Sequence, residues 1–304
     1  MLEAMQALGY RPSHAARTLA RQRTELLGVV FPEIASGFFS EVLRGIDEVA
    51  AERSFHLMTA FSHGLSDEQQ FVSRLLQERR VDALILMNLL LSDDFVRDAS
   101  RRGIPIILLD RPVEGAELFA VSMDNRGGAE AAMAHLISHE YKSFAILIGP
   151  SDNYDAQHRF QGCKEALARA GIPATKVHVW QGGFTEESGR VAIENWLAQG
   201  KPLPEAIFAT NDAMALGVLA GLRERGLRSP QDVALVGFDD TESARHLELT
   251  SVCVPMREMG RLAAEAAIEQ ISNRQARPSR VVATELVVRR SCGCAGNGRT
   301  DSIN

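Results

Sequence analysis

Polar and aromatic residues stand directly after several apolar runs of the sequence, where they could bind a small polyhydroxylated molecule. A sugar is recognised by planar carboxylate, amide and guanidinium groups, which pair with neighbouring hydroxyls, and by an aromatic face that packs on its C–H surface. The candidates of this kind are Phe38, Phe39, Asp110, Arg111, Asp124, Arg159, Phe184, Asn211 and Asp239. Their positions predict an effector site for a sugar or another oxygen-rich small molecule.

Several of these candidates also have a purely structural interpretation. Phe38 and Phe39 could both be core contacts, and we expect one to be buried and the other to face the site. Asp110 precedes Arg111 and Pro112, a combination that also forms turns. For these four residues the sequence alone leaves both interpretations open.

The remaining polar candidates lie at predicted starts of helices. Asp124, Asn211 and Asp239 could each cap the helix that follows, and in the pairs Asn211-Asp212 and Asp239-Asp240 one residue could cap while the other binds. Arg159 is harder to explain structurally, because a cation near the positive end of a helix is unfavourable unless it faces oxygen atoms. Arg159 is therefore the strongest single indication of a ligand.

Catalytic signatures are missing from the sequence. It contains no GxSxG, HExxH or GxGxxG motif, and its one Gly-Lys pair, Gly200-Lys201, is followed by proline instead of completing a phosphate loop. The eight histidines are scattered without the spacing of a ligand set or a triad. We therefore predict a protein that is not an enzyme and needs no cofactor; a sugar hydrolase is the disfavoured alternative.

The cysteines are Cys163, Cys253, Cys292 and Cys294, and their spacing suggests no disulfide framework. Cys292 and Cys294 hint at a metal, but no histidine or second cysteine pair stands near them in the sequence, so we predict free thiols and no metal. The N-terminus shows no hydrophobic signal region and no apolar stretch reaches membrane-spanning length. The sequence predicts a cytoplasmic protein with no membrane partner.

Short apolar runs alternate with amphipathic stretches along most of the chain. This rhythm predicts an α/β fold with parallel sheets covered on both faces. The predicted strands are 26–31, 56–61, 83–87, 104–110, 119–124, 144–149, 177–180, 206–209, 233–238, 252–254 and 281–288. The rhythm restarts after residue 124, which indicates two doubly wound lobes, and ligands of such sheets bind at the carboxyl ends of the strands.

The first 24 residues are basic, whereas the rest of the chain is acidic. They carry four arginines and one acid, a balance of +3, while the whole chain has a net charge of −6 and the remainder therefore −9. Ser13 can cap a short helix whose only large apolar side chain is Leu19 and which presents Arg17 and Arg21. Such a helix has no face to bury in a core, so it is either a frayed tail or an arm that docks on nucleic acid.

Two stretches of the sequence resemble the LacI/GalR family of bacterial transcription repressors. They are GYRPSHAARTLARQRTELLGVVFPEI and ATNDAMALGVLAGLRERGLRSPQDVALVGFDDT. The resemblance extends from about Met1 to Cys292. It implies two lobes of the periplasmic-binding-protein-like type I fold, preceded by a partial helical DNA-binding headpiece and a hinge helix. The implied parts are 1–25 for headpiece and hinge, 26–124 with 254–278 for the N-terminal lobe, 125–253 with 279–292 for the C-terminal lobe, and 293–304 for a disordered tail.

The resemblance also implies roles for individual residues. Positions matching Phe39, Arg159, Phe184, Asn211 and Asp239 line the effector cleft of the family. In the hinge, the position of Leu19 wedges into the minor groove, and the position of Ala16 lets two hinge helices pack together. The residues implied to contact DNA are Tyr10, Arg11, Ser13, Ala16, Arg17, Leu19, Ala20 and Arg21.

The predicted function is that of a homodimeric transcription regulator, a repressor, which binds an effector in the cleft and operator DNA through the hinge. Residues 2–9 resemble only the last headpiece helix, so the recognition helix would precede Met1 and DNA binding by this chain would be compromised. The alternative is a stand-alone sugar-binding protein of the periplasmic type without DNA binding.

Overall fold

The computed structural model of the chain describes residues 23–32, 37–62, 65–87, 91–115, 117–273 and 278–294. The chain divides into two compact units. Unit 1 comprises Met1–Glu33, Arg44–Ala120 and Gly260–Pro278, and unit 2 comprises Ile34–Leu43, Val121–Met259 and Ser279–Asn304. Among the described residues, no helix combines the length and the apolar character needed to cross a membrane.

The first sheet has six strands in the order β11-β5-β4-β3-β1-β2. Its central strands are uninterrupted aliphatic runs because both of their faces are covered, and every residue of β3 and β4 is buried. β1 pairs in parallel with β2 and β3, β3 with β4, and β5 with β11. The bounds are β1 Leu26–Phe31, β2 His56–Phe61, β3 Ala83–Met87, β4 Ile106–Leu109, β5 Phe119–Met123 and β11 Arg280–Val282.

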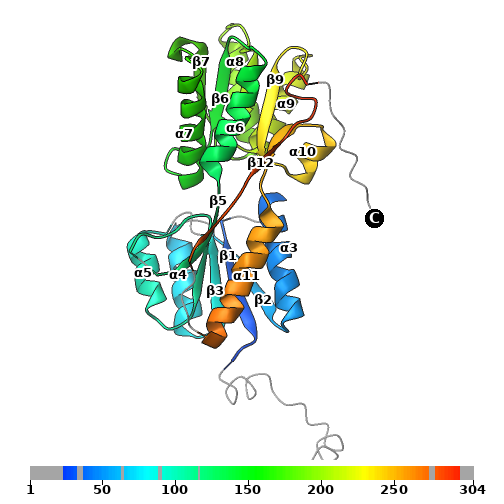
Figure 1. Ribbon diagram of the computed structural model, residues 1–304. Helices are drawn as coiled ribbons and strands as arrows, with labels where there is room; N and C mark the ends of the chain where they lie inside the picture. Colours follow the sequence, from blue (N-terminus) through cyan, green and yellow to red (C-terminus); the bar gives the residue numbers. More distant parts are fainter. Residues whose placement is uncertain are drawn as a thin grey trace, which may run out of the picture. The chain divides into compact units, whose positions relative to one another are not determined.

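Helices α3 (Gly37–Glu52), α4 (Leu65–Gln77), α5 (Asp93–Ser100) and α11 (Met256–Asn273) accompany this sheet. One core cluster joins alternate strand residues, such as Leu84 and Leu86, to Leu75 of α4 and Val96 of α5. α11 lies beside α3, where Arg261 comes within 3.5 Å of Glu48 (Figure 1). Alternate residues of β3 belong to this cluster on one face of the sheet, and the residues between them are buried as well. Both faces of the sheet are therefore apolar.

The second sheet repeats this arrangement with six strands in the order β12-β10-β9-β8-β6-β7. β6 pairs in parallel with β7 and β8, β8 with β9, and β9 with β10, whereas β12 is antiparallel to β10. The bounds are β6 Phe144–Ile148, β7 Val177–Gln181, β8 Ala206–Ala209, β9 Ala234–Asp239, β10 Thr250–Cys253 and β12 Glu285–Val287. The strand order reverses between β6 and β8, which is a topological switch point.

The helices of the second sheet pack in two pairs, α6 with α7 and α8 with α9. Their bounds are α6 Asn125–Ser138, α7 Tyr154–Arg169, α8 Glu186–Ala198, α9 Asp212–Glu224 and α10 Glu242–His246, with a 3-10 turn at Ala174–Lys176. Close approach depends on glycine: a Cβ at Gly217 of α9 would lie 1.8 Å from the carbonyl oxygen of Glu186 on α8. Only a residue without a side chain allows these backbones to touch.

The structure confirms the predicted fold class, with two mostly parallel α/β sheets. The prediction of one continuous final strand over 281–288 is wrong. The chain instead gives β11 to the first sheet and β12 to the second, with Ala283 and Thr284 between them. Helix α10 has only five residues, too few for a periodic signal, and was not predicted. Of the predicted tail, Gly293 and Cys294 are described and residues 295–304 lie outside the described part.

Candidate ligand-binding site

A buried arginine at the switch point of the second sheet is the centre of the candidate site. Arg159 lies in the second turn of α7, whose first turn is capped by Asn153. Its side chain is 4% exposed. Nε donates to Oδ1 of Asn125 at 2.8 Å and Nη1 donates to the carbonyl oxygen of Thr210 at 2.6 Å. Oδ1 of Asp239 lies 3.5 Å from the same Nη1.

The elements around Arg159 explain why these groups converge. Thr210 directly follows β8, Asp239 is the last residue of β9, and Asn125 is the first residue of α6. In a parallel sheet the carboxyl ends of neighbouring strands share one edge, which is where ligands of this architecture bind. The predicted pair Arg159 and Asp239 is therefore brought together by elements of unit 2.

The guanidinium group keeps unused capacity for oxygen acceptors. Within the described part of the chain, the only hydrogen-bond acceptor of Nη2 is Sδ of Met123 at 3.4 Å. A thioether sulfur is a weak acceptor. The ring of Phe238 lies 3.9 Å from the guanidinium carbon, and the Phe184 ring lies 5.8 Å from it. The aromatic faces fix the plane of the guanidinium without consuming its donors.

Phe184 is a half-buried aromatic residue in a left-handed backbone conformation, with φ of 63°. Its ring lies against Gly149, where an added Cβ would be 2.2 Å from the ring. Asn211 fixes this loop: its Nδ2 donates to the carbonyl oxygen of Phe184 at 3.0 Å, while its Oδ1 accepts from the Met214 amide and caps α9. Asn211 thus caps the helix and positions Phe184 with the same side chain.

Burial acts strongly on the acidic residues at this edge. It raises the pKa of the Asp239 carboxyl well above its usual value, although Arg159 acts in the opposite direction. Burial also raises the pKa of Asp212 to about 6, although Ser251 and Thr241 donate hydrogen bonds to this carboxylate. Asp240, in contrast, is paired with Arg245 and Arg289. Of the pair Asp239-Asp240, therefore, Asp239 is the residue that faces Arg159.

The other candidates have contacts outside the arginine site. Asp124 accepts from the Gly127 amide and caps α6. Asp110 is fully buried with φ of 91°, and Arg111 pairs with Asp93 of α5 at 2.8 Å. Phe38 is buried and Phe39 is half-buried, with their rings edge to face.

Sequence reasoning missed four parts of the arginine site: Asn125, Asp155, Thr210 and Phe238. Asp155 accepts from Nδ2 of Asn125 at 2.5 Å, so it fixes the amide that receives Arg159. The position of Asn125 beside Asp124 was the only available signal. The residues expected to contact DNA, Tyr10, Arg11, Ser13, Ala16, Arg17, Leu19, Ala20 and Arg21, lie outside the described residues.

Known proteins match this chain over most of its length. A model of the periplasmic-binding-protein-like domain matches residues 133–292. The HTH-type transcriptional regulator CelR of Thermobifida fusca is 34% identical over 298 residues, covering 95% of this chain and 87% of that protein. Catabolite control protein A of Priestia megaterium is 30% identical over 266 residues, 86% and 80% of the two chains. A solved CelR–cellobiose complex has a TM-score of 0.79 at 30% identity, covering 95% of this chain and 88% of that chain.

The fold is that of a periplasmic-binding-protein-like core. The chain belongs to the LacI family of bacterial transcriptional regulators. The family resemblance predicted from the hinge and the ATND stretch is therefore confirmed. The relative CelR is a transcriptional regulator by its name.

Proposed function

We propose that the chain is an effector-responsive transcription repressor that acts as a homodimer in the cytoplasm. Its effector is a sugar or a related oxygen-rich small molecule, and Arg159, Asp239 and Phe184 are its main contacts in unit 2. The observation that carries this proposal is a buried guanidinium whose Nη2 has only a sulfur partner among the described residues.

The chemistry of the site supports this class of ligand. A guanidinium can donate two parallel hydrogen bonds to neighbouring hydroxyl oxygens, and a carboxylate beside it can accept from them. Phe184 supplies an aromatic face 5.8 Å from the guanidinium carbon, suited to the C–H surface of a ring. The relative whose complex contains cellobiose supports a carbohydrate as the first class to test.

The effector would control DNA binding through thermodynamic linkage. If the operator-bound and the free forms differ in their affinity for effector, each ligand must change the affinity of the other by the same factor. The basic segment with Leu19 is the proposed DNA contact, and a dimer is needed to bring two such segments together. Arg159 and Asp239 would then set the sensitivity of repression to the effector.

A thermal-shift screen with mono- and disaccharides, cellobiose included, tests the effector site. A ligand at about 100 times its Kd should raise the Tm of the wild type by about 5 °C. We expect Arg159→Ala and Asp239→Asn to lose this shift, while Arg126→Ala, an exposed arginine of α6, keeps it. A shift that persists in both site variants would disprove the role of these residues.

The DNA arm needs a separate measurement. In a chain that carries a complete headpiece, Leu19→Ala should weaken binding to a selected operator by at least about tenfold, because an apolar wedge in the minor groove is lost. Light scattering of the same protein should give the mass of a dimer. An unchanged operator affinity together with a monomeric mass would instead favour the stand-alone sugar-binding protein.

A further inference from the structure

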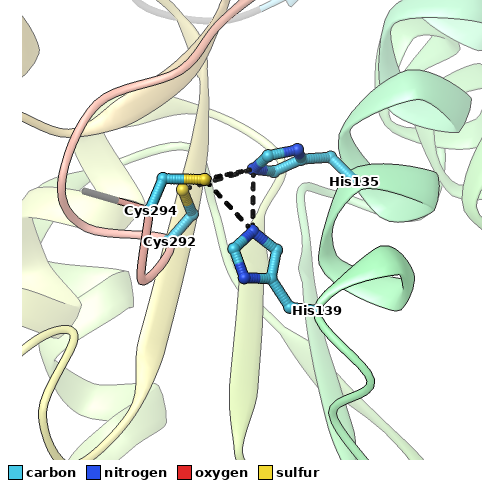
Figure 2. A group of neighbouring side chains, drawn as sticks. All are labelled: His135, His139, Cys292 and Cys294. Atoms are coloured by element: carbon cyan, nitrogen blue, oxygen red, sulfur yellow. Dashed lines mark hydrogen bonds between the residues drawn. The ribbon is translucent and has the colours of Figure 1, made fainter. Parts of the chain in front are cut away.

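Two imidazoles and two thiols meet in unit 2, and none of them takes part in the arginine site. His135 lies in the last turn of α6 and His139 caps the end of this helix, while Cys292 and Cys294 follow β12 (Figure 2). Their ligand atoms all lie within 4.8 Å of one another. No histidine stands near these cysteines in the sequence, but the fold brings His135 and Cys292 together across a separation of 157 residues.

Four of the six distances between these atoms are close to those around a tetrahedral metal ion. With metal–nitrogen bonds of about 2.0 Å and metal–sulfur bonds of about 2.3 Å, a tetrahedron places nitrogen atoms about 3.3 Å apart and nitrogen about 3.5 Å from sulfur. Nε2 of His139 lies 3.4 Å from Nε2 of His135. Sγ of Cys294 lies 3.3 Å from Nε2 of His139 and 3.8 Å from Nε2 of His135, and Sγ of Cys292 lies 3.2 Å from the latter.

Local structure positions all four groups. His135 and His139 are four residues apart, so they lie on the same face of the helix end. Between the two cysteines, Gly293 has a φ of 92°, which turns the chain so that both thiols approach the same point. Tyr141 supports both sides: its hydroxyl donates to the Cys292 carbonyl at 3.0 Å and its ring stacks on His139.

Hydrogen bonds among these four side chains satisfy their donors and acceptors poorly. Two imidazole nitrogens that face each other need one donor and one acceptor, and thiols are weak partners for both. A divalent metal ion would instead satisfy both imidazoles and both sulfurs at once, with the cysteines as thiolates. Two histidines and two cysteines form a donor set typical of structural zinc, with all four positions filled by the protein.

We propose that His135, His139, Cys292 and Cys294 form a structural zinc site that ties the segment after β12 to helix α6. Since metal affinity of such a site is gained only in the folded state, zinc binding stabilises unit 2 against unfolding. The inference does not depend on the proposed effector or on DNA binding.

The first test uses the wild-type chain without an affinity tag, kept reduced and stripped of metal. We expect it to bind one equivalent of Zn²⁺ and to retain it through dialysis, as measured by elemental mass spectrometry. With Co²⁺ we expect the intense visible bands of tetrahedral coordination and a thiolate charge-transfer band. A protein that retains no Zn²⁺ and gives only the weak spectrum of hydrated Co²⁺ would show a hydrogen-bonded cluster and overturn the proposal.

The second test locates the metal. Cys294→Ser and His139→Asn change half-buried side chains, so we expect both to fold. Each should weaken Zn²⁺ binding by at least about 100-fold in competition with a chromophoric chelator, beyond the range of outer-shell changes. Cys253→Ser and His246→Asn are the matched controls in the same unit and should bind like the wild type. Wild-type affinity in both site variants would overturn the proposal.

A third measurement reports the structural effect without relying on a variant. Hydrogen exchange of the wild type with and without Zn²⁺ should show slower exchange at the end of α6 and over residues 285–292, and no change in α4 and α5. Equal exchange in the two states would contradict a zinc tie between these segments.

Discussion

The two units share a sheet topology but differ in how their helices pack and how their buried acids are compensated. Each contains a sheet whose first strand is flanked by its second and third strands, β1 by β2 and β3 and β6 by β7 and β8. Unit 2 packs its helices backbone to backbone at Gly162, Gly189 and Gly217, whereas an added Cβ at Gly28 on β1 of unit 1 would meet side-chain atoms of Leu84 and Val81. The two units thus use these glycines for different contacts.

The units also differ in how they bury acids. Asp212 of unit 2 accepts hydrogen bonds from the Thr241 amide, the Thr241 hydroxyl and the Ser251 hydroxyl. Glu68 of unit 1 is 2% exposed, and its Oε2 has no hydrogen-bond partner among the described residues. The carboxylate of Asp212 in unit 2 is thus surrounded by donors, whereas the carboxyl group of Glu68 in unit 1 is poorly compensated.

The largest expected effect tests the glycine contacts of unit 2. Gly217→Ala should destabilise the protein by about 3 kcal/mol or more, because the new methyl group collides with the α8 backbone, which cannot rotate away. Hydrogen exchange should become faster in α8 and α9 and stay unchanged in α4 and α5. Gly221→Ala is the control, since its methyl group meets a side-chain carbon of Ile193 at 2.6 Å instead of a backbone atom and should cost less. An equal loss of stability in both variants would show that the backbone contact at Gly217 is not the cause of the loss.

A smaller effect is expected at the buried acid of unit 1. Burial raises the pKa of Glu68 to about 7, although Ser62 acts on this pKa in the opposite direction. The folded state therefore favours the protonated acid, and the stability it contributes is complete below pH 4.5 and lost as the pH rises through about 7.

Glu68→Gln cannot ionise, so it should gain stability relative to the wild type at high pH. We expect the difference in unfolding free energy between variant and wild type to be about 2 kcal/mol larger at pH 8 than at pH 5.5. Urea denaturation at the two pH values measures it, with the exposed Glu78→Gln as the control. If the difference in unfolding free energy between variant and wild type did not change with pH, ionising Glu68 in the folded state would carry no free-energy cost.

The smallest effect is expected at Asp82, which holds residues 24 and 25 directly before β1 of unit 1. Oδ1 of Asp82 accepts from the Thr24 amide and hydroxyl, and its Oδ2 accepts from the Glu25 amide at 2.9 Å. Asp82→Ala should cost only about 1 kcal/mol, since these groups are partly exposed and water can replace the carboxylate. Faster exchange of the amides of residues 24–26 would locate the loss. Asp98→Ala, an exposed acid of α5, is the control and should leave these amides unchanged.

Sequence reasoning predicted the strands far better than the site. β1, β2, β3 and β8 have the predicted bounds, because each is an apolar run ended by polar or helix-starting residues. The split between β11 and β12 was missed because Ala283 and Thr284 do not interrupt a strand pattern. The sheet to which a short strand belongs is decided by tertiary pairing, which leaves no local signal.

Residues of the candidate site were predicted where they follow an apolar run, match the family resemblance or are of a type unusual for their position. Arg159 was found because an arginine near a helix start needs an explanation. Asn125 and Asp155 were missed because their role consists of a contact to each other and to Arg159 across 30 and 34 residues. The meeting of His135 with Cys292 was hidden for the same reason, since neighbours in space were distant in the chain.

The division of the last segment between β11 and β12 has a consequence for biosynthesis. Both strands are terminal members of their sheets, and they are only two residues apart in the chain. While the polypeptide emerges from the ribosome, the edge of β5 stays unpaired until β11 is complete at residue 282, and the edge of β10 until β12 is complete at residue 287. A chain that ends at residue 279 lacks both strands and exposes both edges, so we expect it to aggregate.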